Sequence, residues 1–287
     1  MGERLMKVLK FFVGIVLSAI MICSTTLCLG SFAVERATSE QAIREAIDRT
    51  NVIETLMNEV LNENTVNMGG AYGAAAKSIM NTDPMKDYVA AYMAYAISSQ
   101  IYGKETEEVA YDELTKAFDE GVAAAEKENN FSLTTSDYEA IREEMNKTIP
   151  MLTDKLSVAL DRYQTTALNE EMQQRTKDVK LIVSPGFRYG SMGISILVAI
   201  LLIMLFWRSR LGFLWASVNV LLASCAYGVI ALVSNSFADQ SGVLVEPVKR
   251  MLYVMCEYGS MKIAIAGGIT GVVLIIICAI MRALRRV

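Results

Sequence analysis

The sequence predicts an all-α, polytopic membrane protein with four transmembrane helices and a helical-bundle extracytoplasmic domain between the first and the second. Of its 287 residues, 53% are hydrophobic and the mean hydropathy is +0.34, which is too apolar for an ordinary soluble domain. The apolar residues gather in four uncharged segments. The long stretch between the first two segments repeats its apolar residues with helical spacing and has almost no strand-like run.

The four uncharged segments divide the chain into membrane and connecting parts. Each is long enough to cross a hydrocarbon core of about 30 Å as a helix that rises about 1.5 Å per residue. We expect transmembrane helices at residues 11–34, 189–207, 211–236 and 263–281. The other parts are residues 1–10, 35–188, 208–210, 237–262 and 282–287.

If all four segments span, three basic clusters fall on the same side of the membrane. They are Arg4, Lys7 and Lys10, then Arg208 and Arg210, then Arg282, Arg285 and Arg286. The positive-inside rule then predicts that both termini are cytoplasmic in a multi-pass cell membrane protein, with residues 35–188 and 237–262 outside. Trp207 and Trp215 flank the 208–210 turn, where an interfacial aromatic belt is expected.

The first segment has features of both a signal anchor and a cleavable signal peptide. A basic start, an apolar stretch and the small residues Ser31 and Ala33 fit a signal peptide. A signal core usually runs for about 7–15 residues, whereas Phe11 to Phe32 is 22 residues long. We therefore expect an uncleaved anchor, with cleavage within residues 11–34 as the alternative.

The large domain carries no cysteine and a strong negative charge. All five cysteines of the chain lie outside residues 35–188, whereas a eukaryotic secreted domain of this size often carries disulfides, so a bacterial surface is favoured. Between residues 34 and 187 there are 27 acids and 15 bases. This charge argues against nucleic acid or anionic lipid as the partner of the domain. The remaining candidate partners of the domain are a cationic or neutral ligand, a weakly bound divalent cation, or another protein.

Helical periodicity and capping signals predict the elements of the domain. An apolar stripe covers residues 43–61, and further helices are expected at 83–102, 106–127 and 136–172. Three residue pairs predict helix starts: Thr38 with Gln41, Asp83 with Pro84, and Ser136 with Glu139. Gly103 predicts the end of the helix that starts at Asp83. Pro150 predicts a kink or break in the helix over residues 136–172.

Three shorter stretches are less determined. The glycine-rich residues 67–76 fit a loop, a short helix or a hinge. Residues 180–183 are the single strand candidate. Residues 237–262 fit either an interfacial helix on the outer leaflet or a loop that packs against the bundle.

Three tyrosines form the candidate ligand pocket of the domain. Tyr88, Tyr92 and Tyr95 are spaced i, i+4 and i+7, so they share one helix face that could hold a cationic ligand over aromatic rings. The alternative is that they pack in the core with their hydroxyls bonded to polar partners.

The sequence shows no catalytic motif. It has no histidine, which excludes histidine acid/base catalysis and histidine metal ligands, and its paired acids are typical of solvated helix faces. The four segments hold no Asp, Glu, Lys or Arg. In the membrane, the Asn219 side chain is expected to form a hydrogen bond between two helices. The four-residue spacing of Gly267 and Gly271 predicts that another helix packs closely against theirs. We therefore expect no enzyme activity, no cofactor and no bound metal.

The main functional hypothesis is a noncatalytic integral membrane protein. Its exported domain would bind a protein or small ligand and couple to a partner in the membrane, either another membrane protein or a second copy. The alternative is a structural or accessory subunit of a transport or envelope assembly complex. A third reading is a membrane-bound enzyme that uses carboxylates.

Overall fold

The computed structural model describes residues 2–55, 71–102, 111–129, 134–143, 180–207, 211–237 and 246–283. Within these ranges the chain is helical apart from short connections, and it contains no strand, which confirms the all-α fold class. The chain divides into two compact units. The membrane unit consists of Met1–Ala37, Lys177–Ser236 and Cys256–Val287. The helical domain consists of Thr38–Thr176 and Phe237–Met255.

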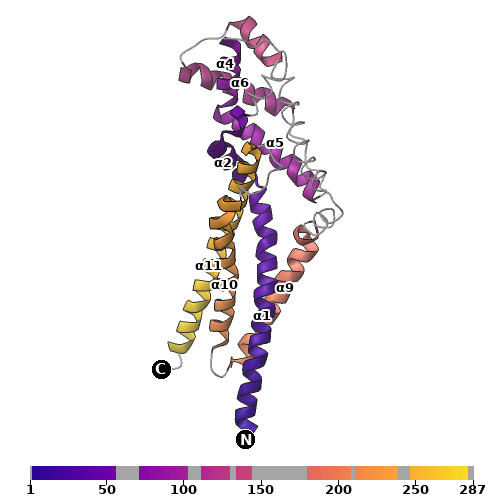
Figure 1. Cartoon of the computed structure of the whole chain (residues 1–287), viewed down its shortest axis with the longest axis vertical. Helices are drawn as coiled ribbons and strands as arrows, with labels where there is room; N and C mark the ends of the chain where they lie inside the picture. Colours follow the sequence, from indigo (N-terminus) through magenta and orange to yellow (C-terminus); the bar gives the residue numbers. More distant parts are fainter. Residues whose placement is uncertain are drawn as a thin grey trace. The chain divides into compact units, whose positions relative to one another are not determined.

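The membrane unit is built from four helices that are long and apolar enough to cross a membrane (Figure 1). They are α1 (Gly2–Ala37), α9 (Pro185–Leu205), α10 (Gly212–Phe237) and α11 (Glu246–Ala283). The last residue of α10 and residues 246–255 of α11 belong to the helical domain. The expectation of four such helices is confirmed, and their composition is that of a multi-pass membrane protein. Ser184 caps α9, since its Oγ accepts a hydrogen bond of 3.3 Å from the amide of Phe187.

Side-chain contacts show that successive membrane helices alternate in direction. At one end, the ring of Trp215 contacts Phe11 at 6.4 Å and Phe206 at 5.7 Å between centroids, which brings together the start of α1, the end of α9 and the start of α10. We call this the tryptophan end. At the other, the Arg188 end, Arg188 near the start of α9 donates to Ser31 late in α1.

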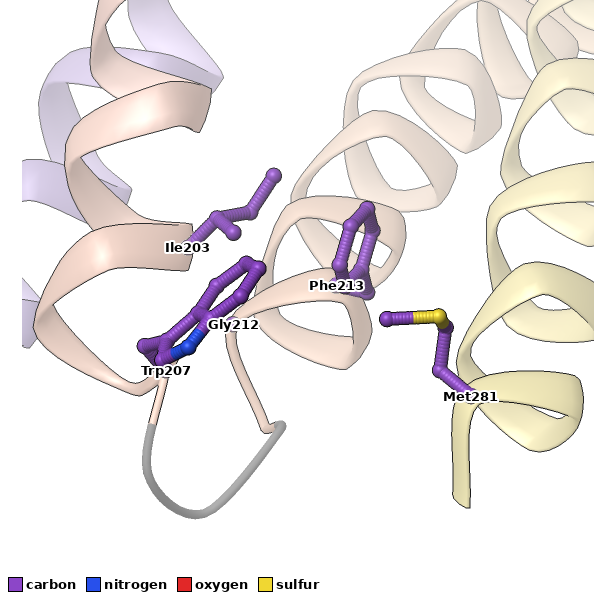
Figure 2. Close-up of a pocket in the computed structure, with 5 residues that line it drawn as sticks. All are labelled: Ile203, Trp207, Gly212, Phe213 and Met281. Atoms are coloured by element: carbon purple, nitrogen blue, oxygen red, sulfur yellow. The ribbon is translucent and has the colours of Figure 1, made fainter. Parts of the chain in front are cut away.

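The fourth helix follows the same alternation. The buried side chains of Ala33, Tyr227 and Ile263 form one cluster, which brings the second half of α10 and the middle of α11 to the final turns of α1. Farther along α11, Met281 lies beside Phe213 of the tryptophan end (Figure 2). Each of the four helices therefore crosses the unit from one end to the other.

The helical domain contains α2 (Glu40–Thr50), α4 (Ala71–Met80), α5 (Asp83–Tyr102), α6 (Tyr111–Asn129) and a helix over residues 135–143. α2 packs on α5, and α6 packs on both α4 and α5. The large side chains that are fully buried in this unit are Ile43, Ile47, Val52, Ile79, Met80, Met85, Ile141 and Met251. Removing such side chains from water is the main stabilising contribution in a soluble helical fold.

The helix starts differ slightly from those that the sequence predicts. α2 is capped by Ser39, whose Oγ accepts from the amide of Ala42 at 3.4 Å, so the predicted cap at Thr38 is one residue early. The helix over residues 135–143 uses Thr134, whose Oγ1 accepts from the amide of Asp137 at 3.2 Å, rather than Ser136 with Glu139. The sequence contains the same capping pattern in two registers, and the earlier one is used.

Two connecting stretches also differ from expectation. Residues 180–183 form a helical turn and not a strand; a strand would need a neighbour with which to pair, and the described residues contain none. Residues 246–262 are the first part of α11 and not a separate interfacial helix, because Pro247 lies in the first turn, where a proline is compatible with a helix. Residues 71–76 are helical within α4. Gly103 and Pro150 lie outside the described residues.

Candidate functional site

The predicted tyrosines of α5 form one continuous row. The centroid of the Tyr92 ring lies 6.5 Å from that of Tyr88 and 6.3 Å from that of Tyr95, within the range of direct aromatic contact. These spacings leave no room for a cation between neighbouring rings. Tyr88 is buried, whereas Tyr92 and Tyr95 are half-buried. A ligand on this row would therefore contact Tyr92 and Tyr95.

Burial changes the chemistry of the innermost tyrosine. Desolvation, followed by the neighbouring Tyr92 and Glu113, raises the pKa of Tyr88 above its ordinary value. Its hydroxyl is thus neutral at physiological pH. The row offers polarisable ring faces and hydroxyl groups, which suit binding and supply no strong base.

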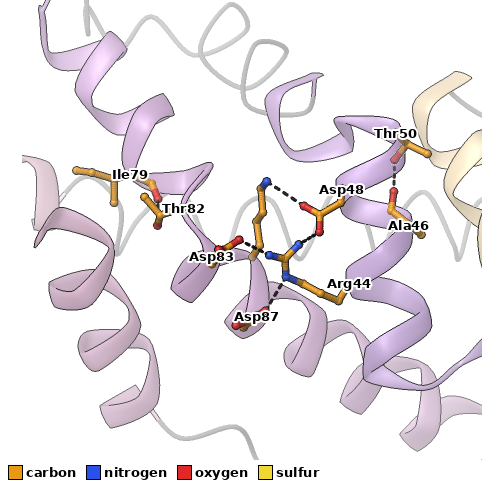
Figure 3. Close-up of polar contacts among 9 residues, drawn as sticks. Arg44, Ala46, Asp48, Thr50, Ile79, Thr82, Asp83 and Asp87 are labelled. Carbon is orange, nitrogen blue, oxygen red and sulfur yellow. Dashed lines mark hydrogen bonds and ion pairs between the residues drawn. The ribbon is translucent and has the colours of Figure 1, made fainter. Parts of the chain in front are cut away.

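An ionic cluster ties α2 to α5 (Figure 3). The guanidinium of Arg44 bonds to Asp83 at 2.5 Å, to Asp87 at 2.6 Å and to Asp48, while Lys86 Nζ lies 2.9 Å from Asp48 Oδ1. The Arg44 side chain is 19% exposed, so the cluster lies at the edge of the core. The sequence shows Arg44 and Asp48 one helical turn apart, but the bonds to Asp83 and Asp87 depend on tertiary packing.

Electrostatics within the cluster favour its charged form. Burial alone would raise the pKa of Asp48, but hydrogen bonds from Arg44 and Lys86 outweigh it and hold this pKa below its ordinary value. The two cations face three carboxylates. Within the part of the chain that the structure describes, no group of three or more acidic, cysteine or histidine side chains is arranged to hold a metal ion.

The predicted packing residues of the membrane unit lie between its own helices. Asn219 is buried, and its Nδ2 lies 3.7 Å from the Sδ of Met21 on α1, a weak acceptor. A Cβ added at Gly267 would collide with the Oγ of Ser224 on α10, and one at Gly271 would meet Leu221 Cγ at 2.5 Å. These two positions of α11 therefore allow α10 to approach closely.

A row of buried and half-buried polar side chains lies between α1 and α9 and is not predicted by the sequence analysis; we call it the polar seam. Its members are Ser24, Thr25 and Ser31 of α1 with Arg188, Ser191 and Ser195 of α9. Ser195 Oγ lies 2.9 Å from Ser24 Oγ and 3.3 Å from Thr25 Oγ1. Arg188, Ser191 and Ser195 are spaced i, i+3 and i+7, so they share one helix face. This spacing is the feature of the sequence that could have predicted the seam.

Arg188 closes the seam at its end of the unit. Its Nε donates to Ser31 at 3.0 Å, its Nη1 lies 2.6 Å from Glu35 Oε2, and its guanidinium lies 4.9 Å from the centroid of Phe32. The guanidinium thus combines an ion pair, a hydrogen bond and a cation–π contact on one neighbouring helix.

A pocket opens at the tryptophan end (Figure 2). It is open to solvent and is lined by Ile203, Trp207, Gly212, Phe213 and Met281 from α9, α10, α11 and the turn after α9. The lining is apolar, and the Trp207 side chain is 63% exposed.

No protein family matches this sequence, and no curated protein or solved structure is detectably similar to it. The fold and the sites define an all-helical protein with four helices able to span a membrane and a separately packed helical domain.

Proposed function

We propose that this chain is a noncatalytic protein of a bacterial cell membrane. In this proposal the helical domain lies outside the cell, binds a protein or small ligand there, and couples to a partner in the membrane. One observation carries it: the chain passes between the membrane unit and the helical domain four times, after Ala37, Thr176, Ser236 and Met255. Among the described residues of the membrane unit, the end of α1 and the start of α9 lie at the Arg188 end, and the alternation of the helices places the end of α10 there as well.

The distribution of charge supports this orientation. The short segments 1–10, 208–210 and 282–287 hold eight Lys and Arg residues, whereas the 237–262 connection holds three. The long segment 35–188 does not count in this comparison, because large domains are translocated largely regardless of charge. The tryptophan end is thus the cytoplasmic end in the proposal, and the passages to the helical domain are outside.

Covalent connections and packing provide a route for coupling. The tyrosine row lies on α5, and the ionic cluster ties α5 to α2. α2 follows α1 after Thr38 and Ser39, and the polar seam holds α1 to α9. A ligand that displaces α5 would therefore shift α2, and the short connection would pass this shift to α1. A shift of this kind needs two arrangements of the helices with different ligand affinity.

Photocrosslinking in intact cells tests the proposed binding. A benzophenone amino acid is placed at Tyr95 and, as a matched control, at Lys116, which is exposed on α6 of the same domain. We expect a discrete adduct from Tyr95 that a Tyr92→Ala substitution weakens, and none from Lys116. Equal or absent adducts at both positions would contradict a site on the tyrosine row.

The same experiment distinguishes the alternative function from the proposed one. Benzophenone is also placed at Ile269 on the exposed face of α11. Strong adducts with a large membrane protein from Ile269 alone would favour a structural or accessory subunit of a transport or envelope complex. Adducts from both Tyr95 and Ile269 are expected if binding outside is coupled to a membrane partner.

A further inference from the structure

The carboxylate of Glu113 lies beside the tyrosine row of Tyr88, Tyr92 and Tyr95. Desolvation raises the pKa of Tyr88, and the nearby Tyr92 and Glu113 raise it further. Because an electrostatic effect of this kind weakens with distance, Glu113 is close to the row. Its side chain, in the first turn of α6, is exposed, whereas the adjacent Leu114 is buried. Glu113 therefore stands at the edge of the surface on which α6 packs against α5.

The packing of α6 gives the level of Glu113 along the row. A Cβ added at Gly121 would meet Met85 Cγ at 3.1 Å, so this part of α6 lies against the first turn of α5. Glu113 precedes Gly121 by eight residues, which is about 12 Å along a helix. In a parallel pair of helices, Glu113 would lie well before the start of α5, too far away to influence Tyr88. The two helices are therefore antiparallel, and Glu113 is about level with Tyr92.

The charge around this edge of the domain is negative. The sequence has no charged residue from Tyr88 to Tyr102. Within the described part of the chain, the carboxylate of Glu113 has no ion-pair partner, and the next lysine along α6, Lys116, lies 3.9 Å from Glu120 instead. The segment between residues 34 and 187 holds 27 acids and 15 bases. The electrostatic potential at the row therefore attracts a cation.

The rings of the row supply a second contact for a cation. The Tyr92 ring is tilted by 31° to that of Tyr88 and by 49° to that of Tyr95, so the three rings do not form a parallel stack. Tyr92 and Tyr95 are half-buried, which leaves part of each ring accessible. The face of an aromatic ring attracts a cation, and a quaternary ammonium ion suits it well. A metal ion such as calcium would instead need several oxygen ligands, and the row offers one carboxylate.

We propose that the ligand of the tyrosine row is a small organic ammonium ion, held over the rings of Tyr92 and Tyr95 with Glu113 as its counter-ion. This inference rests on the proposed function, because it assigns a chemical class to the ligand of the same site. It adds that the site selects a cation over a neutral molecule of the same shape. Contacts at a half-buried surface are individually weak, so selectivity is a sharper property to measure than affinity.

A pair of probes with the same shape tests the inference. Choline is compared with its neutral isostere, the alcohol in which a carbon atom replaces the nitrogen. Each probe is titrated into the full-length protein in dodecyl maltoside, a neutral detergent, and binding is followed by saturation-transfer NMR. We expect choline to bind about tenfold more tightly than the isostere, as two exposed cation–π contacts and one exposed ion pair would give. Equal binding of the two probes, or binding of neither, would overturn the proposal.

Matched substitutions locate the effect. Glu113→Gln, at an exposed position that does not threaten folding, should weaken choline binding about two- to fivefold and leave binding of the isostere unchanged. Glu120→Gln removes the same charge farther along α6 and should change neither. Tyr95→Leu removes one ring and should weaken choline binding, whereas Tyr95→Phe keeps the ring and should preserve it. A preference for choline that survives both Glu113→Gln and Tyr95→Leu would contradict the site.

Failure of this inference is distinguishable from failure of the proposed function. A discrete adduct from benzophenone at Tyr95, together with equal binding of choline and its isostere, would support a site on the row and overturn its assignment to an organic cation. Absence of the adduct would contradict the site itself and this inference with it. The expected result is the adduct together with a preference for choline that depends on Glu113.

Discussion

The side chains packed between helices are large and apolar in the helical domain, whereas the closest contacts in the membrane unit involve glycine and serine. In the domain, Ile47 and Ile79 are fully buried. In the membrane unit, Gly267 lies against Ser224, and Ser217 Oγ donates to the carbonyl of Gly271 at 2.8 Å. The difference follows from the solvent. Water drives large apolar side chains together, but lipid tails are as apolar as those side chains, so close packing and hydrogen bonds must hold membrane helices together.

The largest expected effect comes from removing a large side chain in the domain. Ile47 is 1% exposed, and Ile47→Ala should lower the free energy of unfolding of the domain by about 2–5 kcal/mol. The matched control is Ile269→Ala on α11, where Ile269 is 60% exposed and the change should be within about 0.5 kcal/mol. Amide hydrogen exchange of α2 and α11 in the full-length protein measures both. Equal losses at the two positions would break the comparison.

The next effect comes from adding a side chain to the membrane unit. Gly267→Leu would place atoms where Ser224 already lies, which should cost about 1–3 kcal/mol through overpacking. Gly193→Leu on α9 is the control, since a Cβ there has no atom within 4 Å. Unfolding of the purified protein by titration with sodium dodecyl sulfate measures the difference. A Gly193→Leu protein as unstable as the Gly267→Leu protein would contradict the packing of α11 against α10.

A smaller effect is expected from pH in the helical domain. The pKa of Asp48 is lower in the folded protein than its unfolded value of about 3.9. Its contribution is therefore complete above that value and is lost as the pH falls through the folded pKa. Because Asp48 is partly exposed, we expect a loss of about 1 kcal/mol. Hydrogen exchange of α2 between pH 6 and pH 3 measures it, and Asp48→Asn should remove this pH dependence.

The smallest effect should come from the polar seam. A double-mutant cycle of Ser24→Ala and Ser195→Ala isolates the hydrogen bond between the two hydroxyls. We expect a coupling of about 0.6 kcal/mol, the average for hydrogen bonds between membrane helices. Titration with sodium dodecyl sulfate measures the four proteins. A coupling free energy near zero would mean that packing and the bonds of Arg188, and not this hydrogen bond, stabilise the contact between α1 and α9.

The sequence predicts long elements well and long-range polar contacts poorly. The uncharged segments predict the four membrane helices, because an uncharged apolar stretch of about 18 residues or more has few other uses. The Asp83-Pro84 pair predicts the start of α5 to within one residue. Periodicity identifies residues that share a helix face but does not identify the facing helix. For this reason the tyrosine spacing indicated a shared face, whereas the bonds from Arg44 to Asp83 and from Arg188 to Ser31 were not predicted.

Errors of register have a similar origin. The capping pattern around residues 134–139 occurs twice, two residues apart, and only packing selects between the copies. The run at 180–183 is short and apolar, which fits a strand or a helical turn equally well until its neighbours are known. The sequence does not predict the continuity of α11, because Pro247 fits a loop or the start of a short interfacial helix as well as the first turn of a long helix.

Labelling with a membrane-impermeant maleimide tests the orientation of the two regions most directly. The five native cysteines are replaced by alanine, and Lys127→Cys on α6 or Ser209→Cys between α9 and α10 is added singly. On intact cells, the Lys127→Cys protein should be labelled, and the Ser209→Cys protein should be labelled only after the membrane is permeabilised. Labelling of the Ser209→Cys protein on intact cells, with protection of the Lys127→Cys protein, would contradict the proposed external domain.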